Sequence, residues 1–186
     1  MIYALDTEFI EDGNTIDLVS IGLAAEDGRT FYRQVIQCDY GRANDFVRIH
    51  VLPRLSSCPM GKKNAHWSAM STSAARQTGQ ACPWQHNDCP WQWAEALPAE
   101  LQAFVGESPV FLGYYCAYDW VAICQLFGAM VDLPSGWPYY CIDLRQWLND
   151  RDLRHLTQPE DMDHHALLDA EWIMETYLAY QHKAVS

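Results

Sequence analysis

The sequence predicts a mixed α/β fold, in which a sheet of antiparallel and then parallel strands is flanked by helices. Three strand-like runs with two tight turns fill the first forty residues, and apolar strands alternate with helices from residue 93 onward. Strands joined by tight turns pair antiparallel, whereas strands separated by a helix can pair parallel. At 186 residues, 49% of them apolar, we expect one domain spanning residues 1–186.

Turn residues separate the first three strands. Gly13-Asn14 interrupts the first apolar run, and Asp27-Gly28 is a hairpin signal after the second. A helix over residues 43–55 is expected next, because apolar residues recur at helical spacing before Pro53. The three strands are expected at residues 2–10, 15–24 and 30–35.

The second half of the chain alternates between helices and strands. Pro109 to Tyr115 is a nearly continuous apolar run, as expected of a strand that is buried on both faces. Asp119 is expected just beyond the end of this strand. The helices are expected at residues 93–105, 120–127, 143–148 and 165–180, and the strands at 109–115 and 139–142.

Residues 56–93 break this pattern and are expected to form an inserted loop region with at most one short helix. The segment contains Cys-Pro-Trp twice. A zinc site would draw on Cys82, His86 and Cys89, with Cys58 or His66 as the fourth ligand, but paired C-x-x-C knuckles are missing. We therefore expect its tryptophans to cover apolar surface or to meet another subunit.

The composition of the chain indicates its cellular compartment and the length of nucleic acid that it contacts. No apolar run reaches the roughly 18 residues of a membrane span, and no basic stretch resembling a signal peptide precedes the first strand. Seven cysteines, an odd number, favour free thiols in a reducing cytoplasm. The net charge of −12 argues against a long nucleic-acid footprint and favours contact with a few nucleotides at a chain end.

Four carboxylates in apolar surroundings are the strongest chemical signal. Asp6 and Glu8 lie two residues apart on a strand and therefore share a face, while Asp119 and Asp169 follow other apolar runs. Buried carboxylates are costly unless they are paired or bind a metal. Carboxylate oxygens suit Mg²⁺ or Mn²⁺, so the sequence predicts a metal-dependent phosphodiesterase.

Three motifs carry a resemblance to a known family. Asp6-Thr7-Glu8-Phe9, Tyr118-Asp119 and His164-x-Ala166-x-x-Asp169 resemble the exonuclease motifs of the DEDDh group in the ribonuclease-H-like superfamily. The chain is most similar to the branch of polyadenylate-specific exoribonucleases known from mycobacteria, over residues 1–55 and 108–180. The resemblance implies a ribonuclease-H-like sheet, a homodimer, and removal of nucleoside monophosphates from the 3′ end of single-stranded RNA, with a preference for adenylate.

The same resemblance implies a role for each motif residue. Two hard cations about 4 Å apart clamp the attacking and leaving oxygens in a two-metal mechanism. Asp6 would bridge both ions, Glu8 and Asp169 would bind the ion that activates water, and Asp119 would hold the other ion. His164 would accept the proton of the attacking water, since the pKa of histidine is close to the operating pH.

The sequence leaves two points open: which histidine occupies the motif position, and which residues contact the substrate. A sister group places tyrosine four residues before the last aspartate, where this chain has His165, but only His164 keeps the H-x-A-x-x-D pattern. Many members carry asparagine four residues before the second-motif aspartate, where this chain has Tyr115. The expected substrate contacts are Phe9, Glu11, Ser20, Tyr115 and Arg145, the last from a group with Arg151 and Arg154.

The two alternatives to an exoribonuclease are a DNA exonuclease and a non-catalytic binding module. A 3′-5′ DNA exonuclease would share the fold and differ only in how the 2′-hydroxyl is treated. A non-catalytic nucleic-acid-binding module would have no need of unpaired buried carboxylates, so the complete motif set disfavours it.

Overall fold

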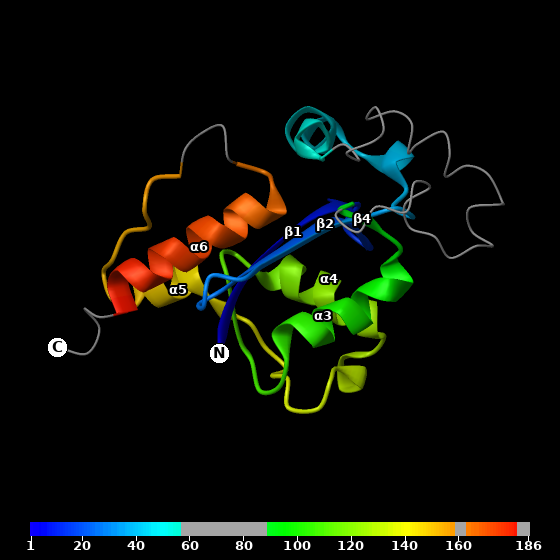
Figure 1. Cartoon of the computed structure of the whole chain (residues 1–186). Coiled ribbons are helices and arrows are strands. Elements are labelled where there is room, and N and C mark those ends of the chain that lie inside the picture. The colour runs from blue at the N-terminus through cyan, green and yellow to red at the C-terminus, as the bar shows by residue number, and fades with distance from the viewer. Residues whose placement is uncertain (57–88, 159–162, 182–186) are drawn as a thin grey trace.

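The computed structural model describes residues 1–56, 89–158 and 163–181 (Figure 1). In this part of the chain six strands form one sheet in the order β4-β3-β2-β1-β5-β6. β1, β2 and β3 pair antiparallel, whereas β5 pairs in parallel with β1, and β6 pairs in parallel with β5. The predicted mixed sheet is therefore confirmed. Its strands are β1 (Ile2–Glu11), β2 (Ile16–Ala25), β3 (Thr30–Val35), β4 (Trp91–Gln92), β5 (Val110–Gly113) and β6 (Ile142–Asp143).

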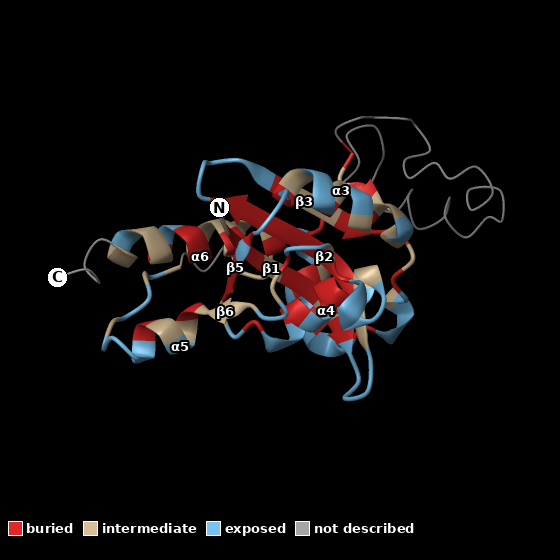
Figure 2. Cartoon of the chain, turned by 90° about the horizontal axis from the view of Figure 1, so that it is seen from below, coloured by how far each residue is buried: buried red, intermediate tan, exposed pale blue. Residues whose placement is uncertain are grey.

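Helices cover both faces of the sheet. α3 (Leu97–Val105) and α4 (Ala117–Phe127) lie on one face, and α6 (Ala166–Gln181) lies on the other, next to α5 (Leu144–Asn149) (Figures 1 and 2). The short 3₁₀ segments are η1 (Tyr40–Arg42), η3 (Leu52–Arg54), η4 (Ala94–Ala96) and η5 (Met130–Asp132).

Strand alternation sorts the side chains of β1 between the two faces. Tyr3 and Leu5 join a buried cluster with α3 and α4, whereas Ala4 joins a second cluster with α5 and α6. Asp6 and Glu8 have the parity of Ala4 and therefore belong to the face that α6 covers. The sequence prediction that these two carboxylates share a face agrees with the strand geometry.

The helix expected over residues 43–55 is irregular. Val47–Val51 form a single π-helical segment, η2, which is followed by the 3₁₀ turn η3. Pro53 has no backbone N–H, so a regular α-helix cannot continue through it. The apolar side chains still pack as the spacing predicts, since Val47, Val51 and Leu55 are buried together.

Two further boundaries differ from the prediction. β6 begins at Ile142, so the aromatic pair Tyr139-Tyr140 is exposed loop and not strand. α4 begins at Ala117, which puts Asp119 inside its first turn instead of before the helix. A tight turn follows Gly113, in which Tyr115 takes a left-handed φ of 54°, and this turn starts the helix early.

One part of the predicted insert joins the sheet. Trp91–Gln92 form β4, which pairs in parallel with β3 at the sheet edge. Trp91 is buried beside Cys89 and Val51, as expected of a tryptophan that covers apolar surface. Cys58, His66, Cys82 and His86, the other zinc candidates, lie outside the described residues. Among the described helices, none is long and apolar enough to cross a membrane.

Candidate active site

The site is built on the face of β1 that α6 covers. Asp6 lies opposite Gly22 of β2, and Glu8 lies opposite Ser20. A Cβ atom added to Gly22 would lie 2.3 Å from the backbone of Ala166, the first residue of α6. Only glycine allows α6 to begin directly on the sheet at this point. This close approach brings the first turn of α6, and Asp169 within it, next to β1.

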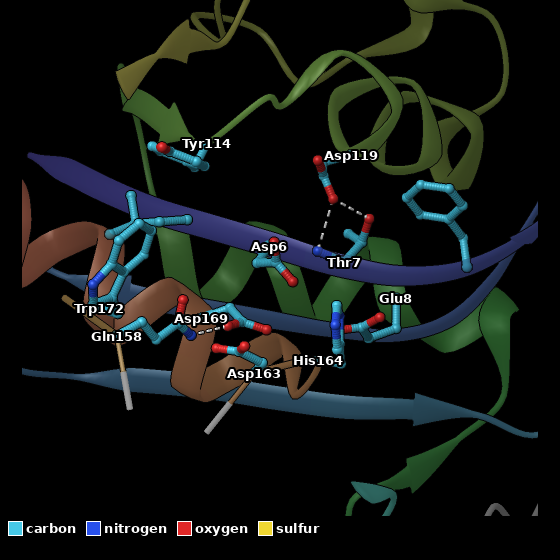
Figure 3. A pocket seen from close by; sticks show the side chains of 12 residues that line it. Asp6, Thr7, Glu8, Tyr114, Asp119, Gln158, Asp163, His164, Asp169 and Trp172 are labelled. Carbon is cyan, nitrogen blue, oxygen red and sulfur yellow. Dashed lines mark hydrogen bonds between the residues drawn. The ribbon is translucent and has the colours of Figure 1, made fainter. Parts of the chain in front are cut away.

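Asp6, Glu8 and Asp169 come together in space. One oxygen of each carboxylate lies within 4.8 Å of the others, an arrangement that can hold a metal ion. They line a pocket of about 380 Å³ that also includes Asp119 and His164 (Figure 3). Five predicted catalytic or metal-binding residues therefore face one cavity, although they come from three distant segments of the sequence.

Asp119 enters the pocket from the opposite face of the sheet. β5 pairs only with Ile2–Ala4 of β1, so the edge of β1 beyond Ala4 is open at this side. The Oδ1 atom of Asp119 fills this edge and accepts hydrogen bonds from the Thr7 backbone N–H (2.9 Å) and hydroxyl (2.6 Å). Thr7, between the two motif carboxylates, thus fixes Asp119 and leaves its second oxygen available to a ligand.

Asp169 is oriented through both of its oxygens. Gln158 donates its side-chain amide to Oδ1, and the His165 backbone N–H donates to Oδ2 at 3.0 Å. These donors stabilise the ionised form and fix the direction of the carboxylate before any ligand binds.

Both histidines precede α6, so His165, which was expected to begin this helix, lies just before it. His164 has a left-handed φ of 63° and lines the same pocket as Glu8 (Figure 3). Its ring lies 4.9 Å from that of Phe46 and 5.7 Å from that of His50. The ring of His165 is instead stacked on Tyr32, with centroids 4.6 Å apart. Of the two, His164 is the one that can reach a molecule in the pocket.

Electrostatics make the metal-free site unfavourable when it is fully ionised. Burial, followed by the charges of Asp119, Glu8 and Asp169, raises the pKa of Asp6 well above its usual range. Burial and the charges of Asp169 and Asp119 raise the pKa of Glu8 to about 8. Burial also raises the pKa of Asp119, against the hydrogen bonds from Thr7. A divalent cation would relieve this repulsion, so the residues present fit such an ion.

These pKa shifts predict how stability depends on pH. Unfolded Glu8 would lose its proton near pH 4.5, whereas folded Glu8 keeps it until about pH 8. The folded state therefore binds more protons in this window, and the unfolding free energy of the metal-free protein should fall as pH rises from about 4.5 to 8. Thermal melts in EDTA at pH 5 and pH 8 would measure the loss, and Mn²⁺ should reverse it at pH 8. A Glu8→Gln variant should show a smaller loss, and a melting temperature that rises with pH in EDTA would contradict the site.

The predicted substrate contacts are spread over a wider region. Phe9 lines the pocket, and its ring packs edge-on against Tyr118 with centroids 5.8 Å apart. Glu11 is exposed and accepts the Gly13 N–H, away from the pocket lining. Tyr115 is 68% exposed and packs against Tyr114, which does line the pocket.

Arg145 and Ser20 do not line the pocket. Arg145 lies beside the Tyr114 hydroxyl, where its charge opposes the rise in pKa that burial causes. Ser20 is fully buried and is the cross-strand neighbour of Glu8. Arg151, of the same basic group, stacks on Trp147 with its guanidinium 4.4 Å from the ring centroid.

Several pocket residues were not anticipated from the sequence. Thr7 had a signal, since it stands between two candidate ligands on the same strand. No sequence pattern marked Gln158 or Tyr114, because a glutamine in a loop and a tyrosine in an apolar strand-like run are both common in residues that have no functional role. Trp172 lies one helical turn after Asp169, a spacing that predicts a shared face. The unanticipated lining residues are Thr7, Tyr114, Gln158, Asp163, Trp172 and Ile173.

Fold and site together define a protein of the ribonuclease-H-like class, with an acidic centre at the side of its central strand that can hold a metal. Comparison with known families gives a more specific assignment. The chain belongs to the family of the 3′-5′ exoribonuclease Rv2179c-like domain, whose model matches residues 1–181. This match confirms the exoribonuclease resemblance and extends it through residues 56–107, which we expected to lie outside.

Two relatives from Mycobacterium tuberculosis agree with this assignment. They are named 3′-5′ exoribonuclease Rv2179c, from strain H37Rv, and 3′-5′ exoribonuclease MT2234.1, from strain CDC 1551. Each is 37% identical to the chain over 171 residues, which cover 91% of this chain and 87% of the relative.

Proposed function

We propose that this chain is a metal-dependent 3′-5′ exoribonuclease that releases nucleoside monophosphates from the 3′ end of single-stranded RNA. The observation that carries the proposal is the cluster of Asp6, Glu8 and Asp169, with carboxylate oxygens within 4.8 Å of one another in a pocket that His164 also lines. Membership of an exoribonuclease family supports the reaction class.

Each motif residue has a proposed part in the reaction. Asp6, Glu8 and Asp169 would hold divalent cations, Mg²⁺ or Mn²⁺, and Asp119 would add its free oxygen from the other side of the pocket. When bound, two such ions supply positive charge to the attacking and leaving oxygens of the phosphodiester. His164 accepts the proton of the attacking water, and Thr7 and Gln158 keep Asp119 and Asp169 in place.

Aromatic side chains in the pocket lining and next to it support binding of a terminal nucleotide. Phe9 faces the pocket, and Tyr118, 52% exposed, stands against it. Stacking on such rings binds any of the four bases, because every base has an aromatic face. The proposed preference for adenylate is supported by the family resemblance alone.

The distribution of charge supports RNA as a partner despite the net charge of −12. No Asp or Glu occurs between Asp45 and Asp88, and five of the twelve basic residues fall in that stretch: Arg48, Arg54, Lys62, Lys63 and Arg76. The described part of the stretch approaches the site. His50 lies near His164, and the positive charge of Arg54 acts on His165. Phosphates upstream of the scissile bond would meet positive charge on this side.

A digestion series tests the proposal. Oligonucleotides of matched sequence, in RNA and DNA versions, are labelled at the 5′ end, labelled at the 3′ end, or blocked at the 3′ end. We expect 5′-labelled RNA to shorten one nucleotide at a time in Mg²⁺ or Mn²⁺, 3′-labelled RNA to release labelled mononucleotide at once, and EDTA or a 3′ block to stop both.

Other outcomes of this series lead to other conclusions. Cleavage in EDTA, or of 3′-blocked RNA, would contradict the proposed mechanism. A faster rate on the DNA version would favour the DNA exonuclease, and binding without cleavage would favour a non-catalytic module. Rates on A, C, U and G homopolymers measure the base preference, and equal rates would remove the adenylate claim.

The proposed setting is a reducing cytoplasm, with a second copy of the chain as partner. Cys38, Cys89, Cys116, Cys124 and Cys141 are free thiols, which supports a reducing compartment. The homodimer is supported by the family resemblance, and light scattering in solution would measure it.

A further inference from the structure

In the described part of the chain, two buried hydroxyl groups without hydrogen-bond partners belong to the face of the sheet that carries Glu8. Ser20 is the cross-strand partner of Glu8, so the two side chains stand on the same face of the sheet. Ser20 is completely buried, and its Oγ makes no hydrogen bond in the described part of the chain. The buried Tyr32 hydroxyl, one strand further on, is likewise unbonded there. Buried polar groups are nearly always satisfied, so a neighbouring pair of exceptions requires an explanation.

The sheet register directs Tyr32 toward Ser20. Tyr32 pairs with Gly22, and Ser20 pairs with Gln34, so Tyr32 and Ser20 are diagonal neighbours on one face. Gly22 contributes no side chain that would separate them. Burial, as the main cause, and the charge of Glu8 raise the pKa of the Tyr32 phenol, whereas the nearby Ser20 hydroxyl opposes this rise.

Tyr32 is also linked to the other side of the site. Its ring is stacked on that of His165 at 4.6 Å, with the planes 25° apart. The backbone N–H of His165 donates to Oδ2 of Asp169 at 3.0 Å. Tyr32 therefore lies between His165, whose backbone N–H orients Asp169, and Ser20, the cross-strand neighbour of Glu8. The stacking on His165 fixes the position of its ring.

We propose that Tyr32 and Ser20 are positioning residues for the ionised form of Glu8: the Tyr32 hydroxyl donates to Ser20 Oγ, and the Ser20 hydroxyl donates to the Glu8 carboxylate. This arrangement gives both unbonded hydroxyls a partner. It operates when Glu8 is a metal ligand, because a carboxylate that binds a cation is commonly oriented by a donor behind it. The inference rests on the proposed function, since it assumes that Glu8 holds a divalent cation.

Titration of Mn²⁺ by calorimetry into the wild-type protein, Ser20→Ala and Tyr32→Phe tests the inference. Loss of a supporting donor should weaken Mn²⁺ affinity about 10- to 100-fold in Ser20→Ala, and less in Tyr32→Phe, where Ser20 can still donate. Thr176→Val is the matched control. It removes another fully buried, unbonded hydroxyl, seven residues and about 10 Å along α6 from Asp169, and should bind Mn²⁺ as the wild type does.

A melt without metal separates positioning from packing. In EDTA, Ser20→Ala and Tyr32→Phe should melt at or above the wild-type temperature, because these substitutions remove buried polar groups that lack partners. Mn²⁺ should raise the melting temperature of both variants by less than it raises that of the wild type. Wild-type Mn²⁺ affinity in Ser20→Ala and Tyr32→Phe would overturn the inference, as would weaker binding that only accompanies a lower melting temperature in EDTA. If wild-type protein binds no Mn²⁺, the proposed function itself fails.

Discussion

Replacing Asp6 with asparagine is expected to abolish exonuclease activity, with a loss larger than the 100- to 10,000-fold that a single general base contributes. Asp6 is close to each of the other three carboxylates, because the charges of Asp119, Glu8 and Asp169 all raise its pKa in addition to burial, which is the largest cause. The amide is close in size but neutral and a weaker ligand. Initial rates on 5′-labelled RNA with saturating Mg²⁺ measure the effect.

The same substitution should leave the metal-free protein as stable as the wild type, or more stable. It removes one of the like charges that repel each other in the buried cluster. Asp150→Asn, on an exposed carboxylate after α5, is the charge-matched control and should keep full activity. Near-normal rates in Asp6→Asn would contradict the assignment of Asp6, and a strongly lowered melting temperature in EDTA would contradict a preformed acidic site.

The second large effect is expected at His164. His164→Ala should lose about 100- to 10,000-fold in rate if this ring accepts the proton of the attacking water. Mn²⁺ affinity should be kept, because the carboxylates are unchanged. His164→Asn is a useful second variant, since asparagine tolerates the left-handed backbone at this position better than alanine does.

His165→Ala is the matched comparison and should cost far less. The backbone N–H that donates to Asp169 remains in the variant. The stacking on Tyr32 is lost, together with the hydrogen bond from the Leu168 backbone N–H to Nδ1 of His165 (3.5 Å). Single-turnover rates of both variants, measured beside Mn²⁺ titrations, give the ranking. A larger loss in His165→Ala would exchange the two roles, and equally small losses would mean that no histidine acts as the base.

Local sequence patterns were sufficient to predict the first three strands and the shared face of Asp6 and Glu8. Both depend on interactions between residues that are near in sequence: turn residues fix the meander, and a period of two fixes the face. The resemblance to the exonuclease motifs also predicted that His164, Asp119 and Asp169 belong to one site, and all three line the pocket that Asp6 and Glu8 line.

Contacts between distant segments were not predictable in this way. Nothing in the sequence around Gly22 says that α6 begins on it, although this contact carries Asp169 to β1. The left-handed turn at Tyr115 places Asp119 inside α4, and the π-helical segment before Pro53 places Phe46 against His164. The buried pair Ser20 and Tyr32 becomes visible only when the strands are in register.

Binding of Mn²⁺ at pH 8 tests the central claim most directly, because the four carboxylates are proposed to bind divalent cations even when no substrate is present. Calorimetric titration of the metal-free protein should show saturable binding of two ions per chain, and the same titration of Asp6→Asn should show this binding lost or greatly weakened. No saturable Mn²⁺ binding by the wild-type chain, or equal binding by Asp6→Asn, would contradict a metal centre formed by Asp6, Glu8, Asp119 and Asp169.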